Sequence, residues 1–282
     1  MGTAPPIAGH PRPITEEEFE LFRVLIYRET GIALKPSKRT LVMSRLMKRL
    51  QQLSLANYSE YYQWLSKKDP QHTELRHMIN CITTNKTSFF REEEHFTILR
   101  RFLAAAGDRA IRIWSAACST GEEPYSIAIT ACEAAAGRVQ IFGSDIDTDV
   151  LARAEAGNYV AESIAGLSPE IRRRYFLRGT GSYAGLVQAK PRLRQMVSFG
   201  RINFVDAAWS VESEPPFDVI FCRNVMIYFD RATQNRLLQR LAARLDPRGL
   251  LFTGHSESLF WMTESLAPVG HSVYRRRTGE PL

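Results

Sequence analysis

A short turn rich in carboxylates is the first part of this sequence that could do chemistry. It follows the apolar run Ile111 to Ala116 and reads SAACSTGEEP from Ser115 to Pro124. A strand, a turn and a helix at the start of an α/β sheet normally place a cofactor at the carboxyl ends of the strands. The turn has one glycine where a dinucleotide fingerprint would have three, which weakens NAD and FAD as ligands.

The charges of this turn narrow the choice of cofactor further. A pyrophosphate favours the positive end of a helix dipole, whereas this helix opens with Glu122 and Glu123, which would repel it. Asp145 ends the next expected strand, where an acidic side chain can accept hydrogen bonds from both hydroxyls of a ribose. The two glutamates could also merely complement the helix dipole. Taken with Asp145, they indicate an adenosine ribose joined to an amino acid with cationic groups, as in S-adenosylmethionine.

The elements that would position these residues form an alternating pattern from Ala110 onward. Short apolar runs alternate with helical stretches, which is typical of a parallel sheet flanked by helices. We expect strands at 111–116, 139–144, 197–204, 218–222 and 250–253, and helices at 122–136, 149–156 and about 231–245.

One spacing departs from this pattern. Asp145 and Asn203, which end the second and third expected strands, are 58 residues apart, about twice what a plain βαβ step needs. The segment 157–196 contains several turn signals and, with Arg201, eight basic residues against two glutamates. We expect an inserted β-rich subdomain with a basic surface.

The residues before this α/β region predict a small helical domain at 14–80, after a disordered tail at 1–13. Thr15 resembles the start of a capping box and Gly31 the end of the same helix. A second helix, about 37–53, has an apolar face and a basic face. The basic face contains Lys38, Arg45, Lys48 and Arg49. It is either an ordinary solvated surface or a docking site for an acidic helix.

Composition limits the class of protein without naming its partner. The formal charge of +7 and the pI of about 9.4 favour an acidic partner, which could be nucleic acid, anionic lipid or protein. The four cysteines lie far apart with no CxxC pair, which argues against a zinc knuckle and a disulfide framework. No apolar run approaches the roughly 18 to 20 residues that span a bilayer, so we expect a cytoplasmic protein.

Four segments in order resemble the chemotaxis receptor methyltransferases, the CheR family. They are TNKTSFFRE at 84–92, STGEEPYS at 119–126, SDIDT at 144–148 and FCRNVMIYF at 221–229. The resemblance covers nearly the whole chain. It implies an all-helical N-terminal domain followed by a class I, Rossmann-like S-adenosylmethionine-dependent methyltransferase domain at 110–282. It also implies a small inserted β subdomain at about 157–196 and a linker at 81–109 that contacts the cofactor.

The resemblance also implies roles for individual residues. Cofactor contacts carried over from the family fall on Asn85, Thr87, Arg91, Glu122, Asp145, Asn203, Phe204, Arg223 and Asn224. Arg91 and Tyr228 match residues beside the transferred methyl group, and no metal is expected. The substrates would be glutamates on acidic receptor signalling helices, docked on the basic face of the helical domain. The short turn from Arg178 to Gly181 resembles family members whose insert also binds the receptor's extreme C-terminal peptide. A monomer that neither inserts into the membrane nor binds nucleic acid is the default.

Elementary chemistry agrees with a glutamate acceptor. A glutamate with a pKa near 4.3 is already ionised at pH 7, so methyl transfer to it needs no strong general base. Carboxylate and sulfonium lose charge in the transition state, and a closed, dry pocket should help. Tyr228, with a reference pKa near 10, would be a poor base but a suitable hydrogen-bond donor to the substrate. We expect Arg91 to orient the cofactor.

Three other functions deserve comparison. The segment Gly254 to Ser258 nearly spells the G-x-S-x-G nucleophile elbow of hydrolases, but its last glycine is missing. A nucleic-acid methyltransferase would explain the basic charge, yet the strand ending at Cys222 lacks the Asn/Asp-Pro-Pro-aromatic stretch typical of base N-methylation. A cysteine nucleophile at Cys222 is less expected than a buried strand thiol. A protein that binds the cofactor only to regulate a partner stays open.

Overall fold

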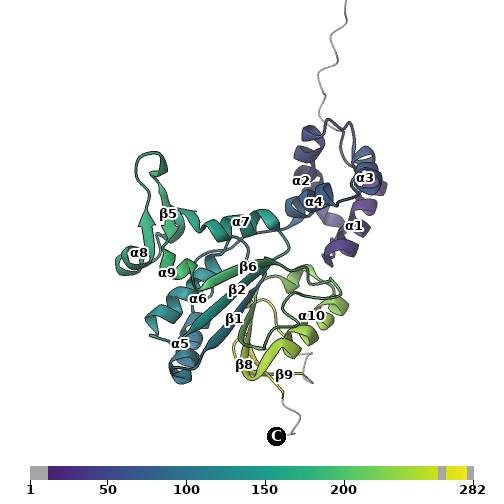
Figure 1. Cartoon of the computed structure of the whole chain (residues 1–282). Coiled ribbons are helices and arrows are strands. Elements are labelled where there is room, and N and C mark those ends of the chain that lie inside the picture. The colour runs from purple at the N-terminus through teal and green to yellow at the C-terminus, as the bar shows by residue number, and fades with distance from the viewer. Residues whose placement is uncertain (1–11, 260–264, 278–282) are drawn as a thin grey trace, which may run out of the picture. The chain divides into compact units, whose positions relative to one another are not determined.

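The computed structural model describes residues 12–259 and 265–277. The chain divides into two compact units between Thr84 and Asn85 (Figure 1). The expected disordered tail lies mostly outside the described residues. Within the described ranges, no helix combines the length and apolar character needed to cross a bilayer.

The first unit contains only helices. They are α1 (Glu16–Thr30), the 3-10 helix η1 (Pro36–Lys38), α2 (Arg39–Gln52), α3 (Tyr58–Lys67) and α4 (Thr73–Ile82). Thr15 and Glu18 form the expected capping box, and Gly31 ends α1 with a φ of 75°, a left-handed conformation that glycine adopts at little cost. Phe22 is fully buried and stacks on Tyr61 with ring centroids 5.8 Å apart. The predicted all-helical character of this region is confirmed.

The second unit is built on a seven-stranded sheet in the order β6-β2-β1-β7-β8-β10-β9. Its strands are β1 (Ile111–Ala116), β2 (Val139–Asp145), β6 (Val197–Arg201), β7 (Phe217–Cys222), β8 (Leu245–Thr253), β9 (Leu266–Gly270) and β10 (Val273–Arg276). The first five strands in that order are parallel, and β10 runs antiparallel to both of its neighbours. The expected parallel sheet is therefore present, extended by two strands that the apolar pattern did not predict.

Helices cover both faces of this sheet (Figure 1). They are α5 (Glu94–Ala106), α6 (Glu122–Glu133), α7 (Thr148–Ala156) and α10 (Arg231–Arg244). α5 lies beside α6, and α10 covers the opposite face. α5 falls inside the segment 81–109, and its residues Phe96, Leu99 and Leu103 belong to the core of the second unit. Most of that expected linker is therefore part of the α/β unit.

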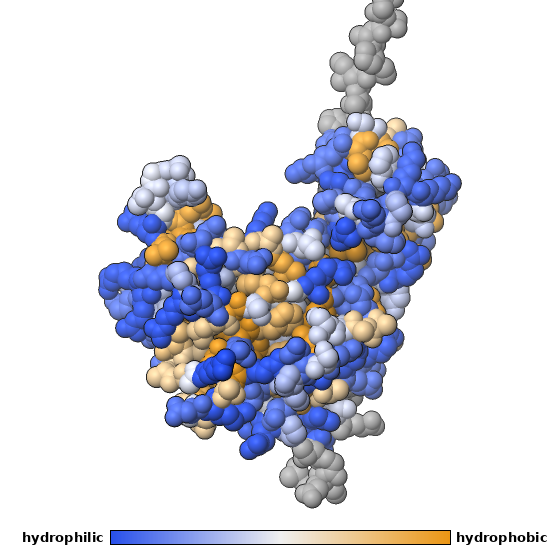
Figure 2. All heavy atoms as spheres, viewed as in Figure 1, coloured by the Kyte–Doolittle hydropathy of each residue, from blue (hydrophilic) through white to orange (hydrophobic). Residues whose placement is uncertain are grey.

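The long interval between β2 and β6 contains α7 and an inserted three-stranded antiparallel sheet. Its strands are β3 (Asn158–Val160), β4 (Phe176–Arg178) and β5 (Leu186–Ala189), in the order β3-β5-β4. The short helices η2 (Ala161–Ile164), α8 (Pro169–Tyr175) and η3 (Gly181–Tyr183) separate them, and α9 (Pro191–Arg194) follows β5. Figure 2 shows hydrophobic atoms on this subdomain next to a strongly hydrophilic region. The predicted β-rich insertion is confirmed.

Candidate functional site

Parallel pairing places the polar residues after several strands at one edge of the sheet. Ala116 at the end of β1 pairs with Ser144 of β2 and with Cys222 of β7, and Cys222 pairs with Thr253 of β8. The segments that follow these strands therefore share the carboxyl edge, where open α/β sheets bind ligands.

The turn after β1 is held in an unusual backbone conformation. Ala117 and Ser119 have φ angles of 68° and 50°, in the left-handed region that residues with a side chain rarely adopt. Gly121 has a φ of 94°, and an added Cβ would lie 2.8 Å from the Cβ of Ala154. The single glycine of the turn is thus required for close packing against α7.

Asp145 ends β2 next to this turn. Its carboxylate accepts hydrogen bonds from the backbone N–H of Ser119 at 2.9 Å and of Asp147 at 3.0 Å. Only 8% of the residue is exposed, and burial raises the pKa of its carboxyl to about 6. In the described part of the chain Asp145 forms no ion pair, so the protein itself supplies no cation to neutralise it.

The two glutamates at the start of α6 have different surroundings. Glu122 is 8% exposed and accepts a hydrogen bond from the Thr120 hydroxyl at 2.7 Å, and burial raises its pKa. Glu123 instead accepts a hydrogen bond from Ser115 and forms an ion pair with Arg223 at 3.0 Å. Of the two glutamates at the start of α6, Glu123 is therefore paired within the protein, whereas Glu122, the predicted cofactor contact, forms no ion pair with a described residue.

The segment from Asn85 to Arg91 lies along the same edge. The Asn85 side chain donates to Asp147 at 2.7 Å, and the Asn85 carbonyl accepts from the Ser119 hydroxyl at 3.0 Å. Further along, the backbone N–H of Phe90 donates to the Ser126 hydroxyl at 2.9 Å. Three stretches far apart in sequence therefore meet at the ends of β1 and β2.

The remaining predicted residues of this segment are partly exposed. Thr87 and Arg91 are both half-buried, and the Arg91 guanidinium donates to the Lys86 carbonyl at 3.0 Å. This hydrogen bond between the Arg91 side chain and the Lys86 backbone closes a local loop of the segment 86–91.

Arg223, directly after β7, is a buried arginine that pairs with two glutamates. Its side chain is 2% exposed and forms ion pairs with Glu92 at 2.9 Å and with Glu123 at 3.0 Å. It also donates to the Arg91 carbonyl and lies near the rings of Phe96 and Phe221. Burial raises the pKa of Glu92, but hydrogen bonds and the charge of Arg223 outweigh it and lower that pKa overall. The arginine thus fixes the segment 91–92, α6 and the end of β7 together.

The loop after Arg223 is anchored by Glu257, a residue that the sequence analysis did not single out. Its carboxylate accepts from the backbone N–H groups of Asn224 at 2.6 Å, Met226 at 2.8 Å and Gly254 at 2.7 Å. Asn224 has a φ of 58° and its side chain donates to Glu92 at 3.2 Å. No spacing rule links residue 257 to a loop 30 residues earlier, so only the fold reveals this anchor.

Tyr228 is held in place by this anchored loop. It ends the 3-10 helix η4 (Met226–Tyr228) and is half-buried. Glu257, which follows β8, fixes the backbone at Met226, the first residue of η4. The position of Tyr228 in the same short helix therefore depends on Glu257.

Asn203 and Phe204 follow β6, the neighbour of β2. Asn203 is 5% exposed, and its amide donates to Asp206 at 3.0 Å. Phe204 contacts the rings of Trp209 and Phe229, with centroids 5.9 and 6.2 Å away. The backbone N–H of Ile202, the residue before Asn203, donates to the Asp145 carbonyl at 3.1 Å. Asn203 and Phe204 therefore follow directly on a residue that is bonded to Asp145.

Strained backbone marks the same regions. Nine non-glycine residues of the described chain have positive φ, and five of them lie in the segments just described: Phe90, Glu92, Ala117, Ser119 and Asn224. Such residues persist only where the surrounding structure holds them, and they cluster at functional sites.

The inserted subdomain is attached directly to this edge. The Tyr159 hydroxyl donates to the Thr120 carbonyl at 2.9 Å, and Phe89 packs its ring against Tyr159 and Phe176. On its outer side a hollow of about 550 Å³ is lined by Ala161, Ile164, Pro169, Arg172, Arg173, Phe176, Leu177, Arg178 and Val187. It therefore combines an apolar floor with three guanidinium groups.

The four basic residues expected to dock substrate lie on or beside α2 in the first unit. Lys38 and Lys48 are exposed. Arg45 donates to the carbonyls of Ile82 and Thr83, and Arg49 pairs with the buried Glu74. Two of the four thus already have partners within the helical unit.

The strand order, five parallel strands followed by an antiparallel strand inserted between β8 and β9, is that of the class I methyltransferase fold. The family model described as "CheR methyltransferase, SAM binding domain" matches residues 85–275, and "CheR methyltransferase, all-alpha domain" matches residues 17–83. The chain belongs to the CheR methyltransferase family.

Curated relatives agree over nearly the full length. The chain is 48% identical over 267 residues to chemotaxis protein methyltransferase 2 of Pseudomonas aeruginosa, covering 92% of this chain and 93% of that protein. It is 45% identical over 265 residues to the chemotaxis protein methyltransferase of Klebsiella aerogenes, with 93% and 90% covered. The corresponding values for the Escherichia coli protein are 43% over 265 residues, with 93% and 91% covered.

Proposed function

We propose that this protein transfers a methyl group from S-adenosylmethionine to glutamate side chains of chemoreceptor signalling helices, forming methyl esters. The observation that carries the proposal is that Asn85 and Asp145 both accept hydrogen bonds from Ser119, in the turn that leads into Glu122. The linker, the first turn and the second strand end meet there, as binding of one small cofactor requires.

The residues at this edge fit the proposed cofactor. Asp145 would accept hydrogen bonds from the ribose hydroxyls, and Glu122 is the acid available for the α-ammonium group. Neither acid has a counter-cation in the described protein, and burial raises the pKa of both. A cationic ligand would favour their ionised forms. Asn203 and Phe204, which follow β6, would contact the adenine.

The reacting end of the site would lie near Arg91 and Tyr228. A substrate glutamate is ionised at neutral pH, so the protein has to align its oxygen with the methyl carbon rather than remove a proton. Alignment of this kind can contribute several kcal/mol, up to about 7 to 11 in well-oriented systems. Tyr228 would donate a hydrogen bond to the incoming carboxylate, and Arg91 would orient the cofactor.

Arg223 and Asn224 have a supporting part in this proposal. Arg223 is enclosed by Glu92 and Glu123, so its main contribution would be to fix the backbone beside the cofactor. Asn224 would present its backbone and amide at the end of β7, held by Glu257.

A cysteine-dependent nucleic-acid methyltransferase receives no support from the site. Cys222 is fully buried within β7, and burial raises its pKa well above the ordinary value, so its sulfur stays a protonated thiol at pH 7. Only a thiolate is an effective nucleophile.

Two basic surfaces would bind the receptor. Lys38 and Lys48 offer exposed ammonium groups to acidic signalling helices. The hollow of the inserted subdomain, with Arg172, Arg173 and Arg178 around an apolar floor, would suit an acidic receptor C-terminal peptide with its terminal carboxylate. The enzyme would act as a cytoplasmic monomer.

The test is incubation of the purified chain with radiolabelled S-adenosylmethionine and receptor signalling domains. We expect base-labile label in receptor glutamate peptides, and no transfer when those glutamates are replaced by alanine. Label in RNA or DNA would contradict the proposal, and cofactor binding without transfer would favour a regulatory scaffold.

The role of Tyr228 has its own test. A Tyr228→Phe variant removes only the hydroxyl, so we expect a lower kcat with unchanged affinity for S-adenosylhomocysteine. Methylation at the parental rate would remove Tyr228 from the mechanism. Tyr27→Phe, a partly exposed tyrosine of α1, is the matched control.

A further inference from the structure

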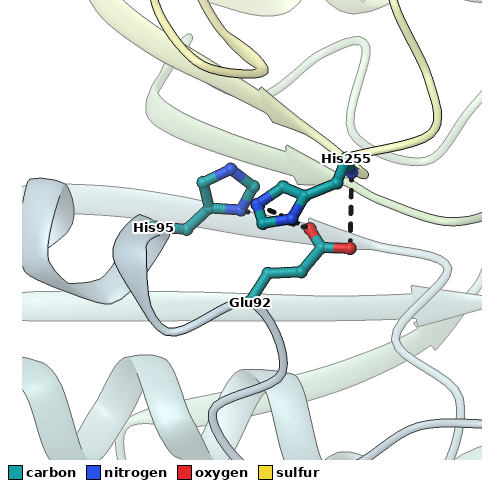
Figure 3. A group of neighbouring side chains, drawn as sticks. All are labelled: Glu92, His95 and His255. Carbon is teal, nitrogen blue, oxygen red and sulfur yellow. Dashed lines mark hydrogen bonds and ion pairs between the residues drawn. The ribbon is translucent and has the colours of Figure 1, made fainter.

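Two histidines and a glutamate of the second unit form a cluster that could hold a metal ion. The proposed methyl transfer requires no metal at this place. Glu92 and His95 flank the start of α5, and His255 follows β8. Figure 3 shows the Glu92 carboxylate directed toward the two imidazole rings. One potential ligand atom from each side chain lies within 4.8 Å of the others.

The separations approach those of a tetrahedral metal centre. His95 Nδ1 is 3.5 Å and His255 Nε2 is 3.8 Å from Glu92 Oε2. Bonds of about 2.0 to 2.2 Å in tetrahedral zinc sites place ligand atoms roughly 3.3 Å apart. Small side-chain movements would bring the three atoms to that spacing. Two histidines and one carboxylate form a ligand set typical of zinc.

His95 supplies an independent observation. The residue is 1% exposed, and no hydrogen bond of good geometry reaches either ring nitrogen from the described residues, although the His271 backbone lies beside the ring. A buried polar atom without a partner costs about 1 to 3 kcal/mol, so such atoms call for an explanation. A metal bound at Nδ1 would satisfy one of the two nitrogens.

The surrounding charge also favours a cation. Glu92 and Glu123 pair with one buried guanidinium, that of Arg223, and Glu94 lies beside His255, so three carboxylates face a single arginine charge in this region. Glu94 Oε2 lies 3.8 Å from His255 Nε2 and is available as a fourth ligand. The side chain of His255 is 35% exposed and that of Glu94 is 73% exposed, which leaves a path for an ion from solvent.

We propose that Glu92, His95 and His255 form a binding site for a zinc-class divalent metal ion, with Glu94 or water as the fourth ligand. The ion would join the start of α5 to the segment after β8. It would lie next to the loop that carries Asn224, whose side chain donates to Glu92. The expectation of no metal rested on cysteine spacing and on the resemblance, neither of which brings residue 255 next to residues 92 and 95.

The test uses Co²⁺ as a spectroscopic probe for zinc on the untagged, full-length chain after treatment with a chelator. We expect one equivalent to bind, with intense visible absorption bands of a tetrahedral centre, and Zn²⁺ to displace it. Neither readout depends on methyl transfer, so failure of the enzymatic proposal would leave the result intact.

His255→Ala is the main variant, because the side chain is partly exposed and its loss should leave the fold unchanged. We expect at least a tenfold loss of Co²⁺ affinity. His95→Leu, checked by circular dichroism, should give the same loss with the ring replaced by an apolar side chain. His77→Ala, an exposed histidine on α4, should bind Co²⁺ like the parent. Absence of stoichiometric binding, or equal binding by His255→Ala and the parent, would overturn the proposal.

Discussion

Two groups of acids lie at the same edge of the sheet but in opposite electrostatic settings. Glu92 faces a buried arginine, and its pKa is lowered despite burial. Asp145 is more deeply buried and faces backbone N–H groups and Asp147, and burial raises its pKa to about 6. One acid is neutralised within the protein, whereas the other is left for a ligand.

This difference separates structural charge from binding charge. Breaking a buried pair leaves its partner uncompensated, so residues such as Arg223 should affect folding and activity together. Acids without a counter-cation already cost stability in the free protein, so their removal should affect ligand binding alone. Each prediction below tests one side of this comparison.

The largest effect is expected for Arg223→Met. Loss of the guanidinium leaves Glu92 and Glu123 without their cation, and breaking a buried pair typically costs about 3 to 5 kcal/mol. We expect a marked fall in the free energy of unfolding, measured by urea titration, and loss of cofactor affinity. Arg248→Met, at an exposed position, should be neutral. Parental stability in Arg223→Met would show that this arginine does not hold the edge together.

Asp145→Asn should give the next largest effect, on binding and not on stability. The variant loses charged hydrogen bonds to the ribose, each contributing about 1.5 to 3 kcal/mol, so we expect a 10- to 100-fold weaker affinity for S-adenosylhomocysteine by calorimetry. The free protein should be as stable as the parent or slightly more so at pH 7. The same charge change at exposed Asp149 is the control. A large loss of stability would place Asp145 with the structural acids.

The pH dependence of binding follows from the raised pKa of Asp145. A raised carboxyl pKa contributes stability to the free protein at low pH and loses it as the pH rises through about 6. Ligand binding favours the ionised form, so affinity should rise between pH 5 and 7 by about tenfold. Asp147 and the buried Cys118 are the other titratable groups facing Asp145.

Calorimetry across this range should show a shallower profile for Asp145→Asn. Glu122, whose pKa is also raised, would supply the remaining slope. An equally steep profile in the variant would assign the pH dependence to another group.

The smallest effect is expected on α2, where the same comparison applies to basic residues. Exposed Lys48→Ala should raise the KM for receptor domains by a few fold, with unchanged stability. Arg49→Ala should instead lower the stability of the helical unit by about 1 to 3 kcal/mol, since it removes the cation that pairs with the buried Glu74 and leaves the Tyr61 hydroxyl as its donor. Exposed Lys67→Ala on α3 is the control. An unchanged KM in Lys48→Ala would argue against docking on this face.

The sequence by itself determined the local elements and the chemical class of the cofactor. Thr15 and Gly31 set the ends of α1, the apolar runs predicted β1 and β2 almost to the residue, and Glu122 with Asp145 argued against a phosphate-bearing ligand. These signals are local, since capping, strand periodicity and the charge of a turn depend on neighbouring residues. The 58-residue interval between Asp145 and Asn203 likewise predicted the inserted subdomain.

Only the tertiary structure decided which charges are free. The pairing of Glu123 with Arg223, the anchoring of the Tyr228 loop by Glu257 and the meeting of His255 with His95 all join residues far apart in the chain. The two added strands β9 and β10 are also set by pairing with β8 rather than by their own pattern. Burial and the choice of partner depend on the packed fold. Two adjacent glutamates such as Glu122 and Glu123 can therefore differ, one being left for a ligand and the other paired with Arg223.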